Sequence, residues 1–308
     1  MRKLTSAFAL GCLAAFAPVQ AVSQGVPAAG VSYSLQQSAA EDPGNRPIPI
    51  VIWAPKAGSR LGLIVISHGT GAGPTAHIDT AQALAEAGFV VVAPMHPGDN
   101  FQDDASVGKS NWFADRSRHV ARVIDYMLTD WEGHARIAPR RIGIFGFSAG
   151  GTTALISVGG APDLGRVTPH CASAPEFVCQ IMRPNVPKQA PQWTHDKRIA
   201  AAVVTAPGIG FAFPPNGLKH VRVPVQLWAG SADETVPYAS NTAIVRNLLP
   251  QAPEFHNVDG AVHLSFLAPC TAQTPAFLCQ DRPGFDRAQF HASFNQSVTA
   301  FFQKQLKR

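Results

Sequence analysis

Residues 141–155, RIGIFGFSAGGTTAL, constrain the fold of this chain more than any other stretch. The apolar, β-branched and aromatic run at 141–147 predicts a buried strand, and residues 150–155 suit a helix. Between them lies G-F-S-A-G, the G-x-S-x-G pattern of a nucleophile elbow, where a serine occupies a sharp strand-to-helix turn. A glycine-rich loop is the alternative, but the flanking strand and helix favour the elbow. We therefore predict that Ser148 is a nucleophile.

Strand-like apolar runs alternate with helical patterns along most of the chain. This alternation is typical of an α/β fold, with a mostly parallel central sheet and helices on both faces. With 308 residues, of which 46% are hydrophobic and 15% charged, the chain is large enough for one such domain. The predicted strands are 48–54, 60–67, 89–94, 141–147, 198–205, 223–229 and 254–258, and the predicted helices are 76–87, 116–131, 239–249 and 289–306.

The chain divides into four predicted parts. Residues 1–21 have the basic start and short apolar run that are typical of a secretory signal peptide. The small residues Val19 and Ala21 predict cleavage after Ala21. Residues 22–47 are predicted to be a tail leading to an edge strand, and residues 48–308 to form the α/β domain. Within that domain, residues 159–197 are rich in Pro, Ala and Gln, lack a hydrophobic period and are predicted to be a lid-like insertion.

The composition also limits location and partners. The N-terminal apolar run is shorter than the about 20 residues that a membrane span needs, so no integral membrane segment is expected in the mature protein. We predict an exported protein, periplasmic or secreted. Removing Arg2 and Lys3 lowers the formal net charge from +5 to +3, and no basic run of five residues occurs, so no nucleic-acid partner is expected.

Four cysteines remain after the predicted cleavage: Cys171, Cys179, Cys270 and Cys279. They form two local couples, and four cysteines allow three pairings. In an oxidising compartment we expect the local pairing, which would staple two loops. Metal binding is the alternative, but no C-x-x-C or compact Cys/His cluster is present, and we expect neither a metal nor a cofactor.

A nucleophilic serine needs a general base and a group that orients this base. Loops that follow the carboxyl ends of parallel strands meet at one edge of a sheet. Asp233 comes four residues after one predicted strand and His263 follows the next, in the order Ser–Asp–His. Glu234 and Asp259 are alternative acids, and Asp233 could instead cap a helix. The ten other histidines lie before Ser148, in the insertion, or at less suitable places along the predicted elements.

An oxyanion hole needs two backbone N–H donors directed at the developing negative charge. Ala149, directly after Ser148 at a helix N-terminus, is one candidate. Thr70, in the loop SHGTGAG after an early strand, is the other, with His68 holding that loop in place. The same loop could cradle a phosphate, but it matches neither GxxxxGK[ST] nor GxGxxG.

Several motifs together resemble the α/β-hydrolase superfamily: SHGTGAG, HPGDN, NWFADRSRHVARVIDYML, GFSAGG, GSADETVP and GAVHLSF. They are most similar to its secreted bacterial esterases of the dienelactone-hydrolase-like and platelet-activating-factor-acetylhydrolase-like type. The likeness runs from residue 48 to the C-terminus, apart from the insertion. It implies a nucleophile at Ser148, an acid at Asp233, a base at His263, and oxyanion donors at Thr70 and Ala149.

The resemblance also implies a small-molecule ester substrate with a short acyl chain. Authentic dienelactone hydrolases have a cysteine nucleophile where this chain has Ser148, which argues against lactone ring opening. Two other classes of function stay open. One is an amidase, peptidase or polyester hydrolase with the same triad, and the other is a non-catalytic binding module on a hydrolase scaffold.

Overall fold

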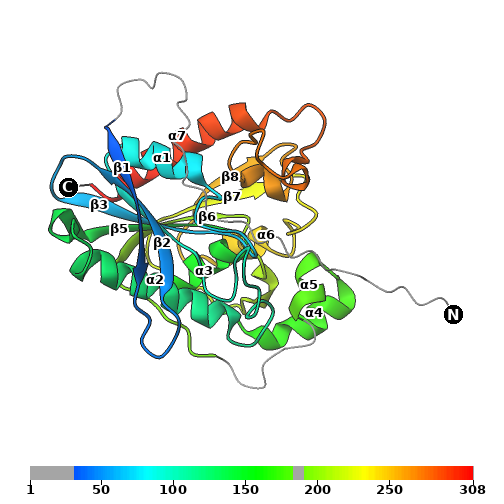
Figure 1. Cartoon of the computed structure of the whole chain (residues 1–308). Coiled ribbons are helices and arrows are strands. Elements are labelled where there is room, and N and C mark those ends of the chain that lie inside the picture. The colour runs from blue at the N-terminus through cyan, green and yellow to red at the C-terminus, as the bar shows by residue number, and fades with distance from the viewer. Residues whose placement is uncertain (1–30, 183–190, 308) are drawn as a thin grey trace. The chain divides into compact units, whose positions relative to one another are not determined.

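A computed structural model describes residues 31–182 and 191–307, and the predicted signal peptide lies outside them. The described strands form one eight-stranded sheet in the order β1-β2-β4-β3-β5-β6-β7-β8 (Figure 1). The pairs β1–β2 and β2–β4 are antiparallel, and all the other neighbours are parallel. The predicted α/β architecture is therefore confirmed, and β5, the strand that leads to Ser148, lies inside the sheet.

The elements that the sequence predicts occur in the predicted order, and β8 has the predicted limits. Among these elements, the predicted and observed first residues differ by at most four positions, at β5 and α2. The strands are β1 (Tyr33–Ala40), β2 (Ile48–Pro55), β3 (Leu61–Ser67), β4 (Val90–Pro94), β5 (Ile137–Phe147), β6 (Ile199–Thr205), β7 (Val225–Gly230) and β8 (Glu254–Val258). The helices are α1 (Ile78–Glu86), α2 (Trp112–Thr129), α3 (Ala149–Ser157), α4 (Val167–Ser173), α5 (Phe177–Met182), α6 (Thr242–Leu248) and α7 (Arg287–Gln305).

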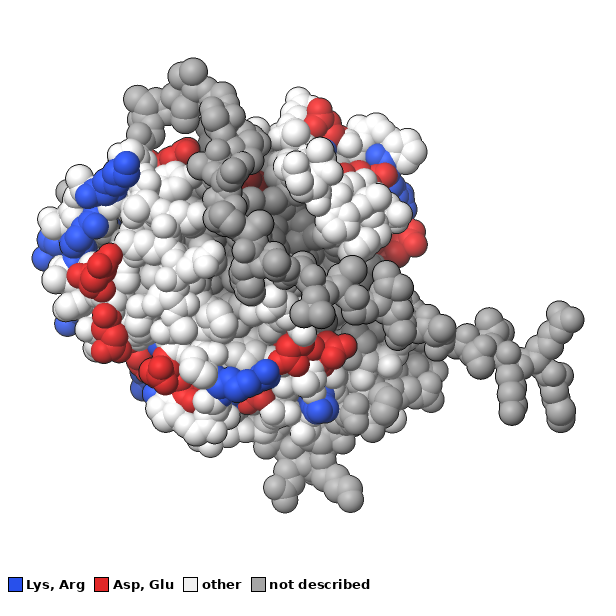
Figure 2. All heavy atoms as spheres, in the orientation of Figure 1, with Lys and Arg blue, Asp and Glu red and all other residues white. Residues whose placement is uncertain are grey.

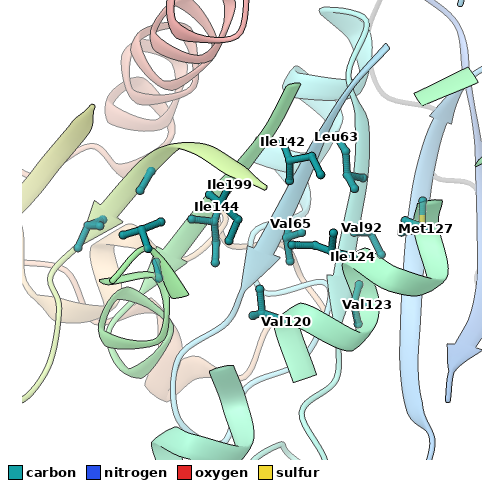
Figure 3. Packing of buried hydrophobic residues seen from close by; sticks show 14 of the residues in the cluster. Leu63, Val65, Val92, Val120, Val123, Ile124, Met127, Ile142, Ile144 and Ile199 are labelled. Atoms are coloured by element: carbon teal, nitrogen blue, oxygen red, sulfur yellow. The ribbon is translucent and has the colours of Figure 1, made fainter. Parts of the chain in front are cut away.

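Two apolar layers enclose the sheet, because side chains alternate between its faces along each strand. In β3, Leu63 and Val65 pack in the layer that includes α2, α3 and α6. Ile64 and Ile66 point to the opposite layer, which α1 and α7 complete. Figure 3 shows the first layer, where the apolar side of α2 meets the valines and isoleucines of the central strands.

The structure corrects the predicted boundary of the domain at residue 48. Residues 33–40, predicted to be part of a tail, form β1 and pair with β2 along its whole length, from Tyr33 opposite Pro55 to Ala40 opposite Ile48. The strand has few large apolar side chains and is half exposed, so the backbone ladder rather than side-chain burial holds it. Hydrophobic pattern is a weak signal for such an edge strand.

The predicted insertion, residues 159–197, contains regular structure in its described part. The short helices α4 and α5 follow one another, and the disulfide Cys171–Cys179 joins them. Helices of this length are too short for a clear hydrophobic period. The second disulfide is Cys270–Cys279, so both cysteine couples have the local pairing expected from the sequence.

No helix among residues 31–182 and 191–307 is long and apolar enough to cross a membrane. Figure 2 shows one face of the molecule, on which acidic and basic side chains are interspersed around an area of other residues.

Candidate active site

Ser148 occupies the sharp turn between β5 and α3. Its backbone has φ +56° and ψ −118°, a left-handed conformation that side-chain-bearing residues rarely adopt. A Cβ atom on Gly146 would lie 2.0 Å from the carbonyl oxygen of Gly150, and one on Gly150 would lie 1.9 Å from that of Ser67. Both glycines of the motif are therefore sterically required, because the turn presses β5, α3 and the end of β3 together.

The structure brings the three predicted triad residues into one hydrogen-bonded chain. Nε2 of His263 lies 2.9 Å from Oγ of Ser148, and its Nδ1 lies 2.7 Å from Oδ2 of Asp233. Asp233 follows β7, and His263 begins a short 3₁₀ turn (His263–Phe266) after β8. Both side chains are buried, which shields the chain of hydrogen bonds from water. The geometry matches a nucleophile, a base and an orienting acid.

Asp233 also binds backbone groups of its own loop, but it does not cap a helix, because the next helix, α6, begins only at Thr242, after Asn241. Its Oδ1 accepts hydrogen bonds from the backbone N–H groups of Thr235 (3.0 Å) and Val236 (2.8 Å), while Oδ2 faces His263. The two backbone donors fix the rotation of the carboxylate. The alternative acids lie elsewhere: Glu234 is exposed and pairs with Arg282, and Asp259 is exposed and accepts from Ser231.

The two predicted oxyanion donors belong to segments that lie close to Ser148. Ala149 is the first residue of α3, where a backbone N–H has no partner within the helix. Thr70 follows Gly69, which passes so close to the elbow that a Cβ on it would lie 3.4 Å from Cβ of Ser148. Within the described part of the chain, no acceptor pairs with the Thr70 amide. Both amides are thus available to an acceptor bound near Ser148.

A buried polar network, not predicted from the sequence, lies beneath the Thr70 loop. Asp99 accepts hydrogen bonds from the Gly71 amide (2.7 Å) and from Nε1 of Trp112 (2.6 Å), and it forms an ion pair with Arg116. Arg116 also donates to the carbonyl oxygen of His68. Burial alone would raise the pKa of Asp99, but the positive charge of Arg116 and the donated hydrogen bonds lower it overall.

The sequence does carry a signal for this network. Arg116 lies four residues before Val120, so it falls on the apolar stripe predicted for α2. A charged residue on the buried face of a helix requires a buried partner. Asp99 in the loop HPGDN supplies it, a pairing that only the tertiary structure reveals.

The turn that carries His263 has its own supports. The backbone carbonyl of Ser265 accepts a hydrogen bond from Nε2 of His291 (2.9 Å), and Nδ1 of His291 lies 2.6 Å from Oδ2 of Asp79. The hydroxyl of Ser265 accepts from the amide of Val262 and donates to Asp281. These bonds connect the His263 turn to α1 and α7.

A cavity of about 680 Å³ opens beside the loop that carries Asp233. One wall is the disulfide-linked α4–α5 segment, and Glu234 and Thr235 form the other. The cavity borders the acid's loop rather than Ser148 itself. Among the residues that the structure describes, no group of three or more His, Cys, Asp or Glu side chains could hold a metal ion.

The fold and the serine turn define an α/β hydrolase, and comparison with known families agrees. The model of the dienelactone hydrolase family matches residues 48–202, slightly more than half of the chain. The chain therefore belongs to the dienelactone hydrolase family, part of the α/β-hydrolase superfamily. The matched region contains the Thr70 loop and Ser148 but ends before Asp233. No curated protein matches the chain.

Proposed function

We propose that this hydrolase cleaves carboxylic esters of short acyl chains through an acyl-enzyme on Ser148. The observation that carries the proposal is the hydrogen-bonded chain from Ser148 through His263 to Asp233, on a strained elbow at the carboxyl end of the central strand β5. A serine hydroxyl becomes an effective nucleophile when an oriented histidine removes its proton.

The proposed reaction has two halves. Oγ of Ser148 attacks the ester carbonyl while Nε2 of His263 takes its proton, and Asp233 holds the imidazolium in place. The oxyanion accepts hydrogen bonds from the amides of Thr70 and Ala149. The tetrahedral intermediate collapses, the C–O bond to the alcohol breaks, and His263 gives the proton to the departing alcohol. Water, activated by His263, then attacks the acyl-enzyme and releases the acid and the free serine.

Labelling with a fluorophosphonate tests the nucleophile. Intact mass and peptide mapping should find a single adduct on Ser148, and Ser148→Ala should remove both the adduct and the hydrolysis of p-nitrophenyl acetate while the fold remains. Undiminished hydrolysis by folded Ser148→Ala would refute the mechanism. A panel of matched esters and amides would separate an esterase from an amidase on the same triad.

We also propose that the protein is exported. Two disulfides and the signal-like composition of residues 1–21, which lie outside the described residues, support this proposal. Expression of the full chain in a bacterium, followed by N-terminal sequencing of the periplasmic fraction, should find a mature protein that begins at Val22. Full-length protein confined to the cytoplasm would contradict export.

A further inference from the structure

We infer that the buried ion pair Arg116–Asp99 positions both halves of the oxyanion hole, a role that rests on the proposed function. The hole is built from backbone N–H groups, so its geometry depends on what holds the backbone around them. This one ion pair hydrogen-bonds to residues on both sides of Thr70. Through the hydroxyl of Thr153, it is also connected to Ala149.

The first link secures the Thr70 loop on both sides. Arg116 donates from Nη2 to the carbonyl oxygen of His68, two residues before Thr70. Asp99 accepts at Oδ1 from the amide of Gly71, the residue directly after Thr70, at 2.7 Å. The carbonyl and the amide that flank Thr70 are therefore bound to the two members of the same ion pair.

The second link reaches the start of α3. Nε of Arg116 donates to Oγ1 of Thr153 (3.0 Å), and this hydroxyl in turn donates to the carbonyl oxygen of Ala149 (2.8 Å). The planar guanidinium thus donates hydrogen bonds toward both proposed halves of the hole, from N–H groups in a fixed relative geometry. A lysine at position 116 could make only some of these contacts.

Burial makes this arrangement costly unless every group is paired. The side chains of Arg116 and Asp99 are each only 1% exposed. Removing two charges from water is unfavourable, and an apolar pair of similar volume often stabilises a fold as well or better. Trp112 completes the pairing with an indole N–H bond of 2.6 Å to Asp99. A contribution to geometry, rather than to stability, therefore accounts best for a buried ion pair with this many hydrogen bonds beside the Thr70 loop.

A pair of substrates separates this positioning role from a general loss of structure. Sulfur accepts hydrogen bonds weakly, so hydrolysis of p-nitrophenyl thionoacetate depends less on the hole than hydrolysis of p-nitrophenyl acetate. The ratio of kcat for the oxoester to kcat for the thionoester measures how well the two amides donate hydrogen bonds to the carbonyl oxygen. We would measure this ratio for Arg116→Lys, Asp99→Asn and Thr153→Val in the full mature protein, together with thermal unfolding.

We expect kcat for the oxoester to fall by about 10- to 100-fold with little change in KM, below the about 10²- to 10³-fold cost of losing one hole donor outright. The thionoester should lose much less, so the ratio should fall. The matched controls are Ser157→Ala and Asp196→Asn. Ser157 bonds a carbonyl four residues back on the same helix, as Thr153 does, and Asp196 is a buried carboxylate paired with Arg198. Both controls should keep the wild-type ratio.

Folded variants with the wild-type ratio, or with equal losses on both substrates, would overturn the positioning role. If Arg116→Lys fails to fold, Thr153→Val still decides the question, because it removes a single hydroxyl. A wild-type protein that neither hydrolyses the esters nor reacts with a fluorophosphonate would overturn the proposed function instead. The two failures are therefore distinguishable.

Discussion

Replacing Asp233 by Asn should disable the proposed base almost without changing the shape of the site. Oδ1 of Asp233 receives two backbone N–H bonds, at 3.0 and 2.8 Å, so the oxygen of the asparagine amide should keep this position. The amide nitrogen must then take the place of Oδ2, 2.7 Å from Nδ1 of His263. Two N–H groups cannot face each other, so the imidazole is driven to the tautomer with its hydrogen on Nε2.

That hydrogen points at Oγ of Ser148, only 2.9 Å away, and His263 can no longer accept the serine proton. The corresponding change in a serine protease lowers kcat by about 10⁴-fold, equivalent to about 5 kcal/mol, and we expect the same order here. Because both backbone hydrogen bonds to Oδ1 remain, the temperature of unfolding should change little.

The assay is the steady-state hydrolysis of p-nitrophenyl acetate, with the rate of fluorophosphonate labelling as a second readout. Asp259→Asn is the matched control, since this exposed acid contacts Ser231 rather than His263, and it should stay within about twofold of wild type. Asp233→Asn within tenfold of wild type, or an equal loss in Asp259→Asn, would refute the assignment of the acid.

Three further predictions concern the elbow, acid stability and the cavity. Gly150→Ala should prevent folding or abolish fluorophosphonate labelling, because its methyl group would lie 1.9 Å from the carbonyl oxygen of Ser67. A soluble variant that is still labelled would contradict this prediction. Burial lowers the pKa of His119 to about 3 and that of His77 to about 4, against about 6.5 when unfolded, so the unfolded chain takes up protons first. The free energy of unfolding, measured with urea, should therefore fall between pH 6.5 and 4.5 by roughly 2 kcal/mol for each of these histidines, whereas a flat profile would contradict the buried neutral state. Glu234 borders the cavity, so Glu234→Lys should raise kcat/KM several-fold for esters that carry an anionic group long enough to reach the cavity, relative to neutral esters of equal size. An unchanged ratio of kcat/KM for the anionic esters to kcat/KM for the neutral esters would exclude the cavity as a substrate site.

Local sequence patterns were enough to predict the order and type of most elements. Apolar runs bounded by turn residues marked seven of the strands, and β8 agrees with its predicted limits. The pattern failed where side-chain burial does not hold the element. Strand β1 depends on its ladder with β2, and α4 and α5 are too short for a period and are joined by a disulfide.

The elbow is the part of the site that the sequence determined by itself. A serine in a left-handed turn, with glycines two residues away on each side, is a local arrangement that five adjacent residues specify. Asp233 and His263 could be proposed from their places after strands, because parallel strands end at one edge. The contact of His263 with Ser148, across 115 residues, and that of Asp233 with His263 depend on the sheet order and on the turn after β8.

Only the tertiary structure decided how the Thr70 loop is held. Arg116 and Asp99 are 17 residues apart and belong to different elements, and each contacts backbone groups that carry no residue-specific signal. A hydrogen bond to a main-chain carbonyl or amide depends on where the backbone passes, not on which side chain it bears. The proposed nucleophile can therefore be found from sequence, whereas the buried ion pair beside the Thr70 loop appears only when the chain is folded.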